Sequence, residues 1–140
     1  MQLRAVCKSK IHRATVTGAD LDYIGSIAID EDLLRRTDII PGEKVHVWNI
    51  NNGERIETYA LPAPAGSGQI VLNGAAARKF RENDKVIIAA FVLTDELVQP
   101  RMILVDELNK FMGELGDNTT GHDLPAHVLL PAKGSHDAGI

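Results

Sequence analysis

The sequence predicts a mainly β protein, a small barrel of short strands with two short helices. Stretches rich in β-branched residues recur along the first 110 residues, and Gly, Pro and Asn separate them. Only two short segments have helical character. With 140 residues and 44% hydrophobic content, the chain suits one domain with a single core. We therefore expect one compact catalytic or binding unit.

The N-terminal part is predicted to hold three strands and a helix. Residues 3–8 and 11–17 have strand composition. Residues 20–30 (DLDYIGSIAID) alternate well enough to form a third strand, although Gly25 and Ser26 lie in its middle, where glycine weakens a strand. Asp30 is the expected N-cap of a helix over 31–38, and Pro41-Gly42 is expected to end it.

A hairpin is predicted next, from residues 44–50 and 54–60 around the Asn-Asn-Gly turn at 51–53. Alternation places Val45 and Val47 on one face of its first strand, opposite His46 and Trp48. On its second strand, one face carries Arg55, Glu57 and Tyr59 and the other carries Ile56 and Thr58. Arg55 and Tyr59 could bind a carboxylate and move a proton, but cross-strand charge pairing fits Arg55 and Glu57 and is the interpretation that these residues alone favour.

The C-terminal half is predicted to hold fewer regular elements. In order, these are a loop at 61–69, a strand at 70–72, a turn and helix at 73–80, a turn at 81–85, a strand buried on both faces at 86–93 and a last strand at 101–107. We expect residues 1–111 to form the domain and residues 112–140, rich in Gly, Pro and polar residues, to form a flexible tail.

Charge and composition exclude several classes of function. The net charge of −4 and the lack of Lys/Arg runs argue against a nucleic-acid or anionic-membrane partner. We expect no membrane segment, because no apolar run approaches ~20 residues. The single cysteine and the lack of a signal-peptide pattern favour a cytoplasmic setting. Histidine spacings match no zinc pattern, and the nucleophile-elbow and phosphate-loop motifs are missing.

Two further patterns allow more than one interpretation. Lys10 and His12 share one face of a predicted strand, where they could serve a site or simply form the polar face of a half-buried strand. The segment 73–77 (NGAAA) could present backbone N–H groups to an anion, or could be an ordinary turn before a helix.

Taken in order, residues 10–30, 45–60, 66–77 and 83–92 closely resemble the aspartate 1-decarboxylase family, and residues 100–107 fit its closing segment. These are bacterial pyruvoyl-dependent enzymes that make β-alanine for pantothenate and coenzyme A. The resemblance implies a double-psi β-barrel, a homotetramer with active sites at subunit interfaces, and L-aspartate as substrate. It also implies self-cleavage between Gly25 and Ser26, which turns Ser26 into a pyruvoyl group that forms a Schiff base with the substrate. Neither PLP nor a metal is expected.

The same resemblance implies residue roles. Thr58 assists cleavage, Arg55 holds the retained carboxylate of the substrate and Tyr59 donates a proton. The other implied site residues are Lys10, His12, Tyr23, Trp48, Asn73, Gly74, Ala75 and Ala76. Two alternatives remain open: a non-catalytic double-psi barrel that acts as a binding or assembly module, and a pyruvoyl decarboxylase for another amino acid. A requirement for an accessory maturation factor is also open.

Overall fold

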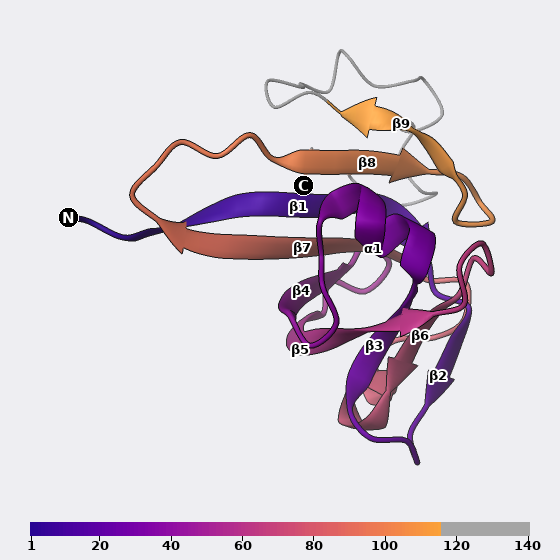
Figure 1. Cartoon of the computed structure of the whole chain (residues 1–140). Helices are drawn as coiled ribbons and strands as arrows, with labels where there is room; N and C mark the ends of the chain where they lie inside the picture. The colour runs from indigo at the N-terminus through magenta and orange to yellow at the C-terminus, as the bar shows by residue number, and fades with distance from the viewer. Residues whose placement is uncertain (116–140) are drawn as a thin grey trace.

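The structure, a computed structural model, describes residues 1–115. It confirms the mainly β prediction (Figure 1). The strands are β1 (Arg4–Thr15), β2 (Gly18–Asp20), β3 (Ser26–Asp30), β4 (Lys44–Asn49), β5 (Arg55–Ala63), β6 (Ile70–Asn73), β7 (Lys85–Thr94), β8 (Arg101–Val105) and β9 (Phe111–Leu115). Within these 115 residues, one α-helix, α1 (Glu31–Thr37), and one 3₁₀ helix, η1 (Gly74–Lys79), connect the strands. No helix among residues 1–115 is long and apolar enough to cross a bilayer.

The strands form one sheet that closes on itself. Their order is β2-β6-β3-β5-β4-β7-β1-β8-β9. Because β2 follows β1 after only two residues, the chain leaves the β7 side of the sheet and joins β6 at its far edge. In that link the Val16 amide donates to the Asp84 carbonyl at 2.9 Å, and the Thr17 amide donates to the Ile70 carbonyl at 2.8 Å. A small barrel results.

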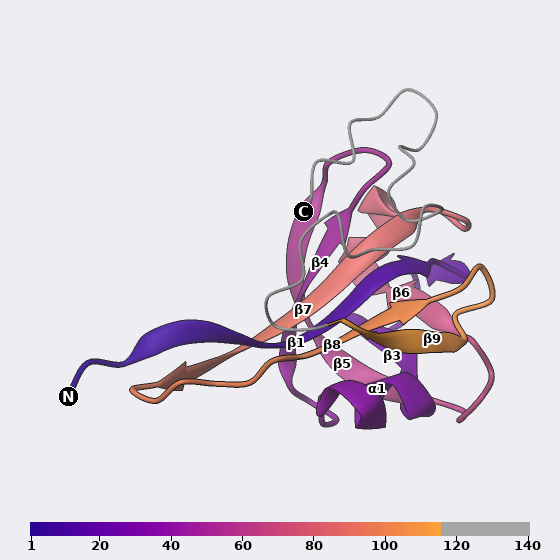
Figure 2. The ribbon, with the colours of Figure 1, turned by 90° about the horizontal axis from the view of Figure 1, so that it is seen from above.

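Parallel and antiparallel pairs are mixed in this barrel. Strand β3 runs parallel to β5, β2 to β6 and β1 to β8, while the remaining neighbours are antiparallel. Parallel neighbours need crossover connections, so the barrel is not a simple meander. Strands β1 and β7 run side by side and extend beyond the rest of the sheet as a two-stranded arm (Figure 2).

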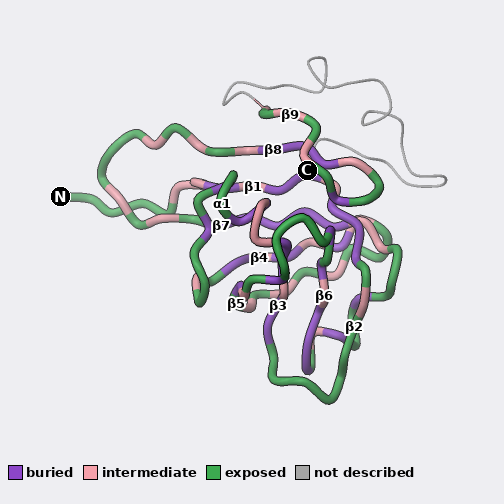
Figure 3. Tube along the Cα trace, turned by 45° about the vertical axis from the view of Figure 1, so that its right-hand side comes forward, coloured by how far each residue is buried: buried purple, intermediate pink, exposed green. Residues whose placement is uncertain are grey.

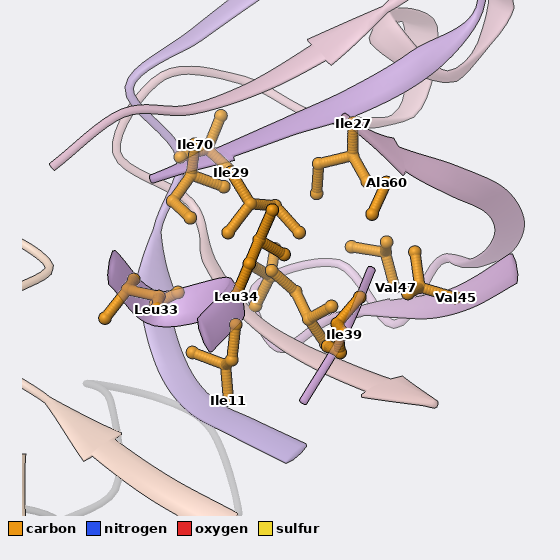
Figure 4. Packing of buried hydrophobic residues seen from close by; sticks show 14 of the residues in the cluster. Ile11, Ile27, Ile29, Leu33, Leu34, Ile39, Val45, Val47, Ala60 and Ile70 are labelled. Carbon is orange, nitrogen blue, oxygen red and sulfur yellow. The ribbon is translucent and has the colours of Figure 1, made fainter. Parts of the chain in front are cut away.

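Branched aliphatic side chains fill the barrel. Ile11, Ile27, Val47 and Ile70 are fully buried and point toward one another (Figure 4). Burial follows the strands closely, whereas the connection between β2 and β3 is exposed (Figure 3). Each buried aliphatic side chain stabilises the fold by about 1.5–3 kcal/mol, so the core fixes the strands that carry the site.

Asp30 links α1 to the loop before β6. As predicted, it caps the helix: its side chain accepts the Asp32 amide at 2.9 Å. The same carboxylate also accepts the amides of Gly66 and Gly68, each at 2.9 Å. Burial raises the pKa of Asp30, but these three amides and the positive charge of Lys110 together outweigh that effect and leave the pKa below its usual value.

Two predictions for the N-terminal region are wrong. The two early strands are one strand, β1, whose pairing with β7 shifts twice, and Arg13 takes a φ of 61° near the second shift. Residues 20–30 are not one strand. Residues 21–25 form an exposed turn, which begins where the Asp22 amide donates to the Asp20 side chain at 3.1 Å. Gly25-Ser26 therefore stands at the entry to β3 rather than in mid-strand.

The hairpin is confirmed, with β4 and β5 in unbroken register from Lys44↔Tyr59 to Trp48↔Arg55. Later elements differ in detail. Strand β5 extends to Ala63, into the expected loop, because it pairs with β3. The buried strand is buried only from Val86 to Ala90, since Phe91 and Leu93 lie on the arm and are exposed.

Two boundaries also shift. The short helix over 73–80 is a 3₁₀ helix, η1. Strand β9 pairs with β8 and extends four residues beyond the boundary expected at residue 111. The remainder of the expected tail, including its three histidines, lies outside the described residues.

Candidate active site

Ser26 is buried at the start of β3, between β5 and β6. Its side chain is wholly covered, and the Asn73 amide nitrogen donates to its hydroxyl oxygen at 3.1 Å. The pairing of Ser26 with Asn73 in the β3–β6 ladder sets this contact. Because a hydroxyl oxygen has two lone pairs, one remains available after Asn73 has bound. Asn73 thus orients the Ser26 hydroxyl, whose oxygen can still accept a second hydrogen bond.

Gly74 makes a close contact with the backbone that precedes Ser26. It has a φ of +67°, and a Cβ added there would lie 2.8 Å from the Gly25 Cα, 2.9 Å from the Gly25 nitrogen and 3.0 Å from the Tyr23 carbonyl oxygen. Only glycine fits both the backbone angle and the space. At Gly25, by contrast, an added Cβ would meet no atom within 4 Å.

Strand β5 carries Thr58 and Tyr59 just before the residues that pair with β3. Ile27 pairs with Ala60, and both lie in the core. One residue earlier on each strand, Ser26 and Tyr59 are therefore level and lie on the opposite, outer face. Thr58, one residue earlier on β5, lies on its inner side, before the part of β5 that pairs with β3. We call the residues at this end of β3, β5 and β6 the cleavage group: Ser26, Thr58, Tyr59, Asn73 and Gly74.

A second group lies on the outer face of β1, β4 and β5. Ile11 faces the core, so its neighbours Lys10 and His12 project to the opposite side. At the hairpin end, Arg55 pairs with Trp48 and its guanidinium carbon lies 4.4 Å from the centre of the indole ring. Such a cation–π contact orients Arg55. We call Lys10, His12, Trp48 and Arg55 the cationic group.

Two side chains of the cationic group, His12 and Lys10, have lowered pKa values because they are buried. Burial, with the positive charges of Lys10 and Arg13, lowers the pKa of His12 to about 4. Its Nδ1 atom is buried without a hydrogen-bond partner among residues 1–115. Burial also lowers the pKa of Lys10. At neutral pH His12 is a neutral imidazole with an unused polar atom, as a ligand-binding position would supply.

An open groove of about 900 Å³ runs along this face. It is lined by Ala5, Lys44, His46, Trp48, Arg55, Ile56, Glu57, Phe91 and Leu93. The groove thus combines cationic and aromatic side chains, which suits a small anion. Lys44, His46 and Phe91 were not among the site residues expected from the sequence, although the hairpin register would have placed Lys44 and His46 beside Glu57.

Within one chain, the cleavage group and the Arg55 end of the cationic group lie apart. The Arg55 guanidinium lies at the hairpin end of β5, and Tyr59 lies four residues further along, or about 13 Å at strand rise. Of the other expected site residues, Tyr23 is 61% exposed in the turn before Ser26, Ala75 is exposed and Ala76 packs against the core. Within residues 1–115, no cluster of three or more His, Cys, Asp or Glu could hold a metal ion.

The fold and these two groups define a small β-barrel protein with a buried serine at a glycine–serine junction and a cationic groove for a small anion. Residues 1–112 match the family model described as aspartate decarboxylase. The chain belongs to this enzyme family.

Curated relatives agree with this assignment. The chain is 58% identical over 109 residues to an aspartate 1-decarboxylase of Carboxydothermus hydrogenoformans, covering 75% of this chain and 86% of the relative. It is 56% identical over 111 residues to one of Moorella thermoacetica, covering 76% and 87%. It is 50% identical over 115 residues to one of Burkholderia ambifaria, covering 79% and 90%.

Proposed function

We propose that this protein cuts its own chain between Gly25 and Ser26, converts Ser26 to a pyruvoyl group and then decarboxylates L-aspartate to β-alanine. The product supplies pantothenate and coenzyme A synthesis. The observation that carries the proposal is the buried Ser26 hydroxyl, oriented by Asn73 and directly preceded by a glycine whose backbone lies against Gly74. These residues fit a serine that must react with its own peptide bond.

The cleavage needs only one water in addition to the chain. The Ser26 hydroxyl oxygen attacks the Gly25 carbonyl carbon, the amide C–N bond breaks and an ester forms. Elimination breaks the ester C–O bond, leaving a Gly25 carboxylate and a dehydroalanine at position 26. Water then replaces the nitrogen, which leaves as ammonia. The products are a fragment of residues 1–25 and a fragment of residues 26–140 that begins with the pyruvoyl group.

The cleavage group supports this chemistry. Glycine at position 25 gives the backbone the freedom to bring its carbonyl to the Ser26 hydroxyl. An amide is a poor electrophile, so a donor must stabilise the oxyanion that forms, and we assign this role to the hydroxyl of Thr58, two residues before the β5 residue that pairs with Ile27. Asn73 holds the Ser26 oxygen, while Gly74 leaves room for the Gly25 backbone.

The cationic group supports aspartate as the substrate. The pyruvoyl group supplies a carbonyl that condenses with an amine and withdraws electrons from its α-carbon. Arg55 binds the carboxylate that is retained, since a planar guanidinium matches a carboxylate in bidentate fashion. Lys10 adds positive charge, His12 and Trp48 line the pocket, and the N–H groups of residues 73–76 bind substrate or shape the cleavage site. Tyr59 delivers the proton that replaces CO₂ on the α-carbon.

We also propose that the complete site forms between subunits of a homotetramer. In one chain, Arg55 turns toward Trp48 at the hairpin end, far from Ser26. The β4–β5 register shows no bulge that would bring the two groups together. A second subunit that presents its cationic group to Ser26 resolves this separation.

Residues 1–111 would form most of the catalytic domain, which β9 extends to Leu115 by pairing with β8. The single cysteine, half-buried Cys7, suits a reducing compartment, so we place the enzyme in the cytoplasm.

Mass spectrometry under denaturing conditions tests the cleavage. The wild-type protein should yield two fragments whose masses add to that of the precursor plus one water minus one ammonia. Phenylhydrazine should label only the fragment that begins at residue 26. Ser26→Ala should stay intact and release no CO₂ from aspartate. Ser67→Ala is the matched control, because Gly66-Ser67 is also a Gly-Ser pair but lies in an exposed loop. An intact wild-type chain after long incubation, or an active Ser26→Ala variant, would refute the proposal.

A comparison of substrates tests the choice of aspartate. Glutamate carries one more methylene, which should move its distal carboxylate away from Arg55. Equal rates for aspartate and glutamate would contradict the assigned role of Arg55.

A further inference from the structure

Glu57 lies between two residues of the proposed site, on the same outer face of β5. Arg55 precedes it by two positions and Tyr59 follows it by two, so about 6.6 Å of strand separates it from each. Its side chain is about half exposed and lines the groove. A carboxylate in this place can interfere with a site whose proposed substrate carries two carboxylates.

Two side chains of the neighbouring strand β4, Lys44 and His46, contact this carboxylate. Lys44 Nζ lies 3.2 Å from Glu57 Oε2, and His46 Nδ1 lies 3.8 Å from Glu57 Oε1. His46 pairs directly with Glu57 in the hairpin. The His46 ring is held in turn against Phe91, with ring centres 5.2 Å apart in an edge-on arrangement. Both oxygens of Glu57 therefore face β4.

Arg55 is the alternative partner for Glu57. Both side chains are long and project from the same face of β5, two residues apart. Yet Arg55 stacks on Trp48, and it makes no ion pair with any residue between 1 and 115. Its guanidinium thus keeps its hydrogen-bonding capacity, while the nearest carboxylate on its own strand is held by Lys44.

We propose that Lys44, with His46 beside it, positions Glu57 away from Arg55 and so keeps Arg55 available for the substrate carboxylate. Lys44 is then a positioning residue that acts through Glu57 rather than by touching the substrate. This inference rests on the proposed function, in which Arg55 binds the retained carboxylate of aspartate. It adds a determinant of substrate affinity to that function.

Loss of Lys44 has a defined consequence. In Lys44→Met, the Glu57 carboxylate loses its partner, pairs with Arg55 and repels an anionic substrate. The KM for aspartate should rise about three- to fivefold, which corresponds to the strength of an exposed ion pair. The kcat should stay unchanged, because the retained carboxylate is bound equally in the ground and transition states.

Four variants test the proposal in a double-mutant cycle. These are Lys44→Met, Glu57→Gln, the double variant, and Arg35→Met as control. Arg35 forms a comparable exposed pair with Glu31 on α1, at 3.3 Å, and its loss removes the same charge. For each fully cleaved protein, KM and kcat for aspartate are measured. Calorimetry gives the Kd of succinate, a dicarboxylate that has no amine to react.

Lys44→Met should raise both KM and the succinate Kd, and the double variant should return both to near the wild-type values. Glu57→Gln should not raise either value, because it removes the carboxylate that competes for Arg55, and Arg35→Met should leave both values near wild type. A double variant as impaired as Lys44→Met would overturn the proposal, because Lys44 would then bind the substrate itself. An unchanged Lys44→Met would overturn it too. A wild-type protein without cleavage or CO₂ release would instead refute the proposed function.

Discussion

Replacing Gly74 with alanine should slow self-cleavage, because a methyl group at this position has no room beside Gly25. The new Cβ would lie 2.8 Å from the Gly25 Cα, whereas ordinary contacts begin at 3.4 Å. One of the two backbone segments must therefore move by about 0.6 Å. In the proposed cleavage Gly25 carries the carbonyl that Ser26 attacks, so this movement would act on the reacting atoms themselves.

Two separate costs follow from the substitution. The φ of +67° at Gly74 costs an alanine about 1–2 kcal/mol in folding free energy. The displacement at Gly25 acts on the reaction, and a misplacement near 1 Å costs about 10²-fold in rate. A movement of about 0.6 Å should therefore slow cleavage by about 10- to 100-fold.

Gly53→Ala separates these two costs. Gly53 has a φ of +78°, yet a Cβ there would meet no atom within 4 Å. This variant should carry the backbone cost of about 1–2 kcal/mol and cleave at nearly the wild-type rate. Cleavage is followed as the fraction of intact chain by mass spectrometry, and stability by urea unfolding in a Ser26→Ala background, where the chain stays whole. If Gly74→Ala cleaved as fast as Gly53→Ala, the contact with Gly25 would have no role in cleavage.

Two predictions concern stability against pH. His12 has a folded pKa of about 4 and an ordinary value of 6.5, so the unfolded chain takes up a proton first as pH falls. The free energy of unfolding should fall by about 3 kcal/mol between pH 6.5 and 4, and urea midpoints of His12→Gln should lack this slope. Asp30 has a lowered pKa, so its contribution is complete above pH 3.8 and is lost as pH falls through its folded pKa. Asp30→Asn should therefore lose about 1–3 kcal/mol at pH 7 and flatten the urea midpoint below pH 3.8, whereas a wild-type slope there would contradict this assignment.

The hairpin could be predicted because its information is local. Alternation at period two and an Asn-Asn-Gly turn are sufficient to set the register of β4 on β5, and with it the faces of Arg55, Thr58 and Tyr59. The helix cap at Asp30 is local as well. Its bonds to Gly66 and Gly68 are not, because the loop that carries them is more than thirty residues away.

The strand predictions are wrong where the local structure depends on contacts with residues far away in the sequence. Residues 20–30 alternate like a strand, but β6 pairs with both β2 and β3, and the exposed turn at 21–25 connects them. The Asp20 side chain accepts a hydrogen bond from the Asp22 amide, and an aspartate at such a position is the local sequence signal for this turn. Strand β9 is short and forms only by pairing with β8 after a turn in which Asn109 takes a φ of 60°. The resemblance to a known family implied a set of candidate site residues, but not their division into two groups.

The position of β1 and β2 on the same side of the proposed cut would affect how the cleaved protein refolds. Residues 1–25 contain both strands, and these close the barrel against β6, β7 and β8. The proposed cut would therefore leave a two-chain molecule whose smaller chain supplies strands of the barrel itself. The precursor can refold alone, at a rate independent of protein concentration. After the proposed cut, the barrel would have to reassemble from two chains at a concentration-dependent rate. Unfolding would therefore be far harder to reverse for the cleaved protein than for the precursor.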